Sequence, residues 1–127
     1  MAEHNKLGVE GERIAYRYIE QLGYTILEKN WSIDGKKEVD IFATDGRDLI
    51  AIEVKTRRTD SGFDPLTAVT RQKQANIIAL TNTYVRLKGV TQPIRFDIIA
   101  VWFHPFDQLF DIKHYKDAFR ATLRTRS

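Results

Sequence analysis

A carboxylate pair and a lysine are the residues of this sequence best placed to do chemistry. Asp40 lies in an alternating segment over residues 37–43, and Glu53 and Lys55 lie in a second one over residues 48–56. The two segments are predicted to be the strands of a β-hairpin. Because side chains alternate along a strand, Glu53 and Lys55 are expected to point to the same face. The pattern therefore predicts one acidic and basic cluster on a strand pair.

The turn between these strands decides which carboxylates face each other. Asp45-Gly46 lies between the segments and is typical of a hairpin turn. A loop of two or four residues with its centre just after Gly46 puts Asp40 opposite Glu53, and a turn centred on Asp45-Gly46 puts Glu38 there instead. In either register the acids share one face of the hairpin with Lys55, and only an odd loop length would put Glu38 and Asp40 on the other face.

The chemistry expected of such a cluster involves a divalent cation. Two carboxylates on directly opposite residues lie about 5 Å apart and repel by about 3 kcal/mol at an effective dielectric near 20. Mg²⁺ (or Mn²⁺) removes this repulsion and still binds water and phosphate oxygens. The predicted ligands are Asp40 and Glu53, with Glu38 nearby and the Val54 carbonyl as a further oxygen. Lys55 would orient the attacking water or stabilise charge on the phosphate.

The alternative is an exposed strand face with a cross-strand ion pair, which is worth under about 1 kcal/mol. Apolar residues on both faces of the hairpin strands argue against it, because they predict a central strand pair covered on both sides. The surrounding elements follow from periodicity and turn residues. They are a helix over 6–22, a strand over 24–31, the hairpin, a helix over 65–87 that is either continuous or broken near Thr70, strands over 95–103 and 109–115, and a short basic helix from 116 to about 123.

This order, α-β-β-β-α-β-β-α, predicts an α/β fold with a mixed central sheet flanked by helices. A length of 127 residues is the usual size of one domain, so residues 1–127 are expected to form a single one. The chain has no cysteine, which excludes thiolate metal sites and favours a reducing cytoplasm. It shows neither a signal-peptide pattern nor the ~18–20 apolar residues that span a bilayer, so no membrane association is expected.

Positive charge is concentrated in the second part of the chain. Residues 1–54 hold 7 basic and 11 acidic side chains, residues 55–127 hold 13 and 6, and the net charge is +3. This distribution favours a polyanionic partner such as DNA, with a solvated basic face as the alternative. The predicted phosphate contacts are Arg57, Arg58, Lys73, Arg120 and Arg124.

Four further groups of residues bear on the site or the core. Lys73 lies on the apolar face of its helix, where it either reaches solvent or enters the site. Asp97 alternates with apolar residues and is predicted to be a structural partner of a buried arginine or backbone group. The histidines show no ligand spacing. The aromatic residues near the C-terminus are predicted to be core or a homodimer patch rather than a base-stacking platform: Trp102, Phe103, Phe106 and Phe110.

Asp40 followed by Glu53-Val54-Lys55 on the next strand resembles the PD-(D/E)xK nuclease superfamily, which includes restriction enzymes and Holliday junction resolvases. Nearly the whole chain is similar to one member family, the small bacterial YraN-like proteins, which are described as predicted endonucleases. Lys37 stands where that family usually has glycine, and Val39 replaces the proline of the superfamily name. The matching segments are 8–12 with Ala15, 23–24, 38–41, 53–57, Phe63 with Pro65, 68–69, Lys73 and 95–97.

The resemblance implies a restriction-endonuclease-like fold and a divalent-metal-dependent endonuclease acting on DNA, including branched or junction DNA. It also implies that Glu12 is a further acidic site residue, whereas a surface glutamate favoured by the helix dipole is the plain alternative. Gly8 and Gly11 would allow close approach of the sheet or of a phosphate, or would only fray the helix. The competing functions are a catalytically weak nucleic-acid-binding module and an interaction protein in a DNA repair or uptake pathway.

Overall fold

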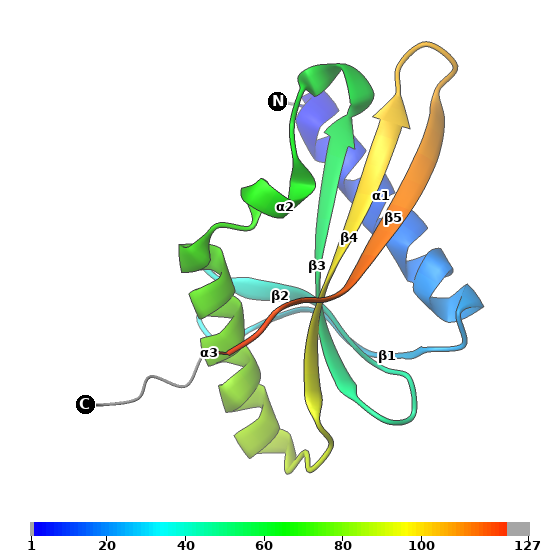
Figure 1. The fold of residues 1–127 in the computed structure, drawn as a ribbon. Helices are drawn as coiled ribbons and strands as arrows, with labels where there is room; N and C mark the ends of the chain where they lie inside the picture. The colour runs from blue at the N-terminus through cyan, green and yellow to red at the C-terminus, as the bar shows by residue number, and fades with distance from the viewer. Residues whose placement is uncertain (1, 122–127) are drawn as a thin grey trace.

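Two long helices lie on opposite sides of a five-stranded sheet in the computed structural model, which describes residues 2–121 (Figure 1). Among these residues, no helix is long and apolar enough to cross a bilayer. The elements in chain order are α1 (Ala2–Gln21), β1 (Thr25–Ser32), β2 (Glu38–Thr44), β3 (Leu49–Arg58), the 3₁₀ helix η1 (Thr59–Ser61), α2 (Pro65–Ala68), α3 (Arg71–Lys88), β4 (Ile94–His104) and β5 (Leu109–Phe119).

The sheet has the strand order β1-β2-β3-β4-β5, so β3 is central. Neighbouring strands are antiparallel except for β3 and β4, which are parallel. Parallel neighbours need a crossover connection, and α2 and α3 supply it. The predicted mixed α/β fold is confirmed, and its arrangement is consistent with a restriction-endonuclease-like fold.

Apolar side chains cover both faces of the central strands, as predicted. On one face Ala15 and Ile19 of α1 pack in a cluster with strand residues such as Ile52. On the other face Ile77 and Tyr84 of α3 belong to a second cluster of strand side chains. Each cluster consists mostly of fully buried residues, so the β2–β3 pair is held rigidly between two layers of helix.

The predicted break near Thr70 is present and separates α2 from α3. Asp64 caps α2 by accepting the Leu66 N–H at 3.0 Å, and Pro65 occupies the first helical position. Thr70 caps α3 by accepting the Lys73 N–H at 3.2 Å. The cap places Lys73 in the first turn of α3, at the end of the helix that faces the site.

The β2–β3 register agrees with the prediction that puts Asp40 opposite Glu53. The ladder runs from Ile41 paired with Ile52 to Thr44 paired with Leu49, which leaves a four-residue loop over 45–48. Asp45 stabilises this loop because its Oδ1 accepts the backbone N–H groups of the third and fourth loop residues. The even loop length keeps the predicted acids and the lysine together.

The predicted short helix from residue 116 is wrong. Strand β5 continues to Phe119, with an irregularity in its pairing to β4 and a positive φ of 54° at Asp117. Two contacts favour the strand: Asp97 Oδ1 accepts the Asp117 N–H at 2.9 Å, and the Phe119 ring stacks on Phe96 at 5.1 Å. The predicted end of the helix, at about residue 123, lies among residues 122–127, outside the described part of the chain.

Candidate functional site

The predicted site residues converge on one pocket of about 300 Å³, here called the acidic pocket. It lies where β2 begins, beside the middle of β3, and both long helices contribute to it. Seven of its lining residues were predicted from four separate segments of the sequence, and the fold brings them together. The lining residues are Glu12, Lys36, Lys37, Glu38, Asp40, Glu53, Val54, Lys55, Lys73, Asn76 and Ile77.

Asp40 is fixed against the central strand by a backbone group. The regular pairing of β2 with β3 covers Ile41 to Thr44, so Asp40 lies just outside it. The Asp40 Oδ2 instead accepts the Val54 N–H at 2.8 Å. The carboxylate thus takes the place of a ladder carbonyl, and its position depends on the β3 backbone rather than on a flexible side chain.

The two facing carboxylates bring negative charge close together at Asp40. The pKa of Asp40 is raised well above its usual range by burial, by the charge of Glu53 and by a side-chain hydrogen bond with Glu53, against the lowering effect of the Val54 N–H. Burial, Glu12 and Glu53 also raise the pKa of Glu38, although that side chain is exposed. The pocket therefore favours a proton or a cation next to Asp40.

Two lysines meet at one oxygen of Glu53. Lys55 Nζ lies 3.3 Å from Glu53 Oε2, and Lys73 Nζ lies 3.9 Å from the same atom. Glu53 and Lys55 are both buried, with 7% and 9% of their surface exposed. A hydrogen bond with Lys55 and burial lower the pKa of Lys73. Of the two predicted placements of Lys73, the one that reaches into the site is therefore observed.

Glu12 reaches the acidic pocket from α1 and is held by a residue that the sequence interpretation missed. The Tyr16 hydroxyl donates to Glu12 Oε1 at 3.0 Å. Burial, then the charge of Glu12, raises the pKa of Tyr16 to about 12, so the phenol keeps its proton. The spacing of four residues on one helix is the signal that could have found this pair.

The close approach of α1 to the sheet explains one of the two early glycines. A Cβ on Gly11 would overlap the side chain of Thr56 on β3, so this residue must be a glycine for α1 to pack where it does. A Cβ on Gly8 would meet nothing within 4 Å. The predicted close approach to the sheet is therefore observed at Gly11 and not at Gly8.

The predicted phosphate-contacting arginines separate into two places. Arg57 and Arg58 follow Lys55 at the end of β3, beside the site. Arg57 lies 4.1 Å from the Phe63 ring centroid and donates to the Thr56 carbonyl, and Arg58 bonds Asp60 through two N–H groups. Arg120 instead lies by a different pocket and is paired with Asp117, and Arg124 is outside the described residues.

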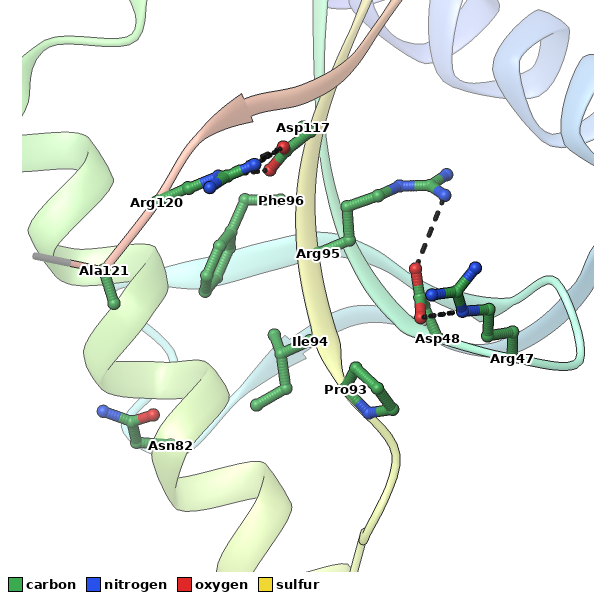
Figure 2. A pocket seen from close by; sticks show the side chains of 10 residues that line it. All are labelled: Arg47, Asp48, Asn82, Pro93, Ile94, Arg95, Phe96, Asp117, Arg120 and Ala121. Carbon is green, nitrogen blue, oxygen red and sulfur yellow. Dashed lines mark hydrogen bonds and ion pairs between the residues drawn. The ribbon is translucent and has the colours of Figure 1, made fainter.

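The pocket beside Arg120 has a volume of about 580 Å³ and lies between α3, the start of β4 and the end of β5 (Figure 2). Its arginines are matched by aspartates. Arg47 and Arg95 lie 3.8 and 3.7 Å from the carboxylate of Asp48, and Arg120 points at Asp117 (Figure 2). The wall carries charges of both signs in close pairs, so it lacks the excess of positive charge that attracts a polyanion.

Asp97 has the structural role that the sequence predicted. It is fully buried and accepts two hydrogen bonds from Arg95, at 2.9 and 2.8 Å, and one from the Asp117 backbone N–H. His114 Nε2 lies 2.7 Å from the same carboxylate, and the Tyr18 hydroxyl bonds its other ring nitrogen. These contacts lower the pKa of Asp97 against the effect of burial. The network ties β4 to β5 and contributes nothing to the acidic pocket.

The aromatic residues near the C-terminus divide between core and surface. Phe110 packs at the edge of the α1-side core and contacts the Phe103 ring at 5.0 Å. Phe106, in the β4–β5 turn, is fully exposed. The homodimer contact stays a prediction.

Within residues 2–121, no three histidine, aspartate or glutamate side chains stand close enough together to hold a metal ion by themselves. A cation would therefore depend on Asp40 and Glu53, with backbone or water oxygens completing its shell. This is the ligand set typical of Mg²⁺ rather than of metals held in closed protein cages.

The fold and the site define a small mixed α/β protein with a buried carboxylate–lysine cluster on its central strands. Residues 11–101 match the family described as "Uncharacterised protein family UPF0102", and the chain belongs to this family. The resemblance to the YraN-like proteins is thereby confirmed.

Relatives from several bacteria match along nearly their whole length. A protein of Phocaeicola vulgatus is 45% identical over 94% of this chain and 96% of its own. Proteins of Porphyromonas gingivalis and Flavobacterium psychrophilum are 37% and 40% identical, covering 98% and 94% of this chain and 91% and 98% of their own. Each is described only as a UPF0102 protein, so the comparisons identify the family and leave its activity open.

Proposed function

We propose that this protein is a divalent-metal-dependent endonuclease of the PD-(D/E)xK superfamily that hydrolyses phosphodiester bonds in DNA. The observation that carries the proposal is the pair formed by the half-buried Asp40 and the buried Glu53, with Lys55 against it. Desolvation and the charge of Glu53 raise the pKa of Asp40 on this central strand pair. Keeping that arrangement costs stability, and a bound hard cation offsets the cost.

The residues present fit Mg²⁺ or Mn²⁺. Asp40 and Glu53 offer carboxylate oxygens, and Glu12 and Glu38 line the same pocket, where they would bond coordinated water. In a β-strand, the N–H and C=O groups of one residue point toward the same neighbouring strand. Because the Val54 N–H bonds Asp40 on β2, the Val54 carbonyl also faces the Asp40 side of β3. When bound, the ion would polarise the phosphate and lower the pKa of a bound water.

The chain's own residues would then position the reacting groups. The Val54 N–H holds the Asp40 carboxylate in place, which spares the reorganisation of a free side chain. Lys55 is buried beside Glu53 and would stabilise the negative charge that develops on the phosphate. Lys73 is half exposed, so it would reach a phosphate oxygen from the α3 side. Arg57 and Arg58, two and three residues after Lys55, would hold the strand on either side of the cleaved bond.

The second candidate is a nucleic-acid-binding module without catalysis. One observation favours it: Lys55 and Lys73 already lie within 4 Å of Glu53, and two ammonium groups would neutralise this carboxylate in the absence of a cation. Against it, the pKa of Asp40 stays raised with both lysines nearby, and the pKa of Glu38 is raised as well.

The test is cleavage of a DNA panel with Mg²⁺, with Mn²⁺ and with chelator alone. The panel contains duplex, single strand, a flap and a four-way junction. The matched variants are Glu53→Ala and Glu20→Ala, which removes an exposed glutamate of α1 that does not line the acidic pocket. We expect metal-dependent cleavage by the wild type and Glu20→Ala, and none by Glu53→Ala. Metal-independent cleavage, or equal cleavage by Glu53→Ala, would overturn the proposal, and salt-sensitive DNA binding without cleavage would favour the binding module.

A further inference from the structure

A second pocket of about 310 Å³ adjoins the acidic pocket, and it is here called the basic pocket. The two share Glu12, Val54 and Lys55, so a chain bound in one continues directly into the other. The remaining lining residues come from the first turns of α1, from the end of β3 and from η1. They are Leu7, Gly8, Thr56, Arg57, Arg58 and Ser61.

Gly8 forms part of the wall of the basic pocket, and nothing in the fold requires a glycine there. Gly8 lies inside α1 and does not have a positive φ, and a Cβ there would meet no atom within 4 Å. A glycine in a helix costs about 1 kcal/mol relative to alanine. Gly11, three residues later, is needed for packing on Thr56, whereas the space in front of Gly8 is empty. Glycine allows a ligand to approach the backbone closely, and this explains the residue.

The walls of the basic pocket match a nucleotide. Lys55, Arg57 and Arg58 supply positive charge for a phosphate, and Arg57 is held in place by its stacking on Phe63 and its bond to the Thr56 carbonyl. Leu7 and the nearly buried Val54 supply apolar surface for a sugar or a base. The volume is at the small end of the ~300–1,000 Å³ range of ligand pockets, which suits one nucleotide rather than a helical segment.

We propose that the basic pocket binds one unpaired nucleotide of a DNA strand, next to the phosphate that is cleaved at the acidic pocket. In a paired duplex the bases are stacked inside, so only the outer phosphates would reach this pocket. An unpaired nucleotide turns into it without loss of base pairing. The inference rests on the proposed nuclease function and narrows its substrate class to DNA with unpaired nucleotides at the cleaved bond.

The test compares two DNA probes that differ only in pairing. Both carry 2-aminopurine at one position, which is paired in a duplex probe and unpaired at the base of a flap in the other. Binding is measured by anisotropy in Ca²⁺, and 2-aminopurine fluorescence reports whether the base leaves the stack. We expect the wild type to bind the flap about tenfold more tightly, the size of effect that insertion of one base supports.

The decisive variants are Gly8→Leu and Val9→Leu. Leucine at residue 8 begins from a Cβ that meets no atom within 4 Å and adds a bulky side chain to the wall of the basic pocket, whereas Val9 is 63% exposed and does not line either pocket. We expect Gly8→Leu to bind flap and duplex equally and Val9→Leu to keep the wild-type preference. Gly8→Ala, with a smaller side chain, should lose only part of it, and its unfolding temperature should not fall.

The outcomes separate this inference from the proposed function. Cleavage and binding without preference for the flap, or an unchanged preference in Gly8→Leu, would overturn the inference and leave the nuclease proposal standing. Absence of both binding and cleavage on every DNA would overturn the two together.

Discussion

Replacing Asp40 with asparagine should make the metal-free protein more stable at neutral pH. The carboxylate faces Glu53, and burial and this neighbour raise its pKa. Asparagine keeps an oxygen that accepts the Val54 N–H and has nearly the same shape, so the 2.8 Å bond is retained. The substitution therefore removes the charge repulsion and little else.

The magnitude follows from the charges around the pair. Two carboxylates about 5 Å apart repel by about 3 kcal/mol at an effective dielectric near 20. Lys55 and Lys73, at 3.3 and 3.9 Å from Glu53, offset part of this. We expect a net gain of roughly 1–2 kcal/mol, which for a domain of this size raises the unfolding temperature by about 3–8 °C.

The gain should depend on pH with a defined sign. Since the pKa of Asp40 is higher in the folded protein than in the unfolded chain, the folded state holds the proton more tightly, and wild-type stability falls as pH rises through the folded-state pKa. The variant lacks this loss, so the difference in unfolding temperature should be small at pH 5 and larger at pH 8.

The assay is thermal unfolding followed by circular dichroism, in chelator, at both pH values. Asp60→Asn is the matched control, because Asp60 is exposed and its hydrogen bonds with Arg58 lower its pKa. That control should gain nothing at pH 8. An Asp40→Asn protein that is less stable than the wild type at both pH values would refute the reasoning, since it would mean that the carboxylate stabilises the apo fold.

Two further predictions concern the scaffold. Gly11→Ala should destabilise the protein by about 1–3 kcal/mol in urea unfolding, because the added Cβ overlaps Thr56. Gly8→Ala on the same helix should stabilise the protein by up to about 1 kcal/mol. Similar effects of the two substitutions would contradict the packing described for α1. Asp97→Ala should cost about 3–5 kcal/mol, because it removes the buried carboxylate that both Arg95 and His114 contact. Asp111→Ala, which removes an exposed partner of His104, should cost under about 1 kcal/mol. A loss of less than about 1 kcal/mol for Asp97→Ala would contradict the structural role of that network.

The site geometry was predictable from the sequence because it depends on local rules. Alternation along a strand and an even hairpin loop are enough to bring Asp40, Glu53 and Lys55 to one face. The capping pair Asp64 and Pro65 likewise located the start of the helical segment that follows β3. These features depend on residues close in sequence, where pattern and geometry are directly linked.

What the sequence did not reveal depends on contacts between distant residues. The basic segment after Tyr115 was predicted as a helix, but bonding to Asp97, some twenty residues earlier, extends it as a strand. The separation of Arg120 from the site follows from the same extension. The basic pocket also requires the end of β3 to lie beside the first turns of α1, which no periodicity encodes.

The measurement that tests the central claim most directly is single-turnover DNA cleavage by Lys55→Ala in Mg²⁺, with binding titrated in parallel in Ca²⁺. Lys55 lies 3.3 Å from Glu53 and is one of several cations near the DNA path, so its loss should lower the cleavage rate by about 10²–10³ and weaken binding only modestly. Lys113→Ala, which removes an exposed lysine of β5, should leave both unchanged. If Lys55→Ala cleaves DNA as fast as the wild type, Lys55 is not part of a catalytic site and the nuclease assignment is wrong.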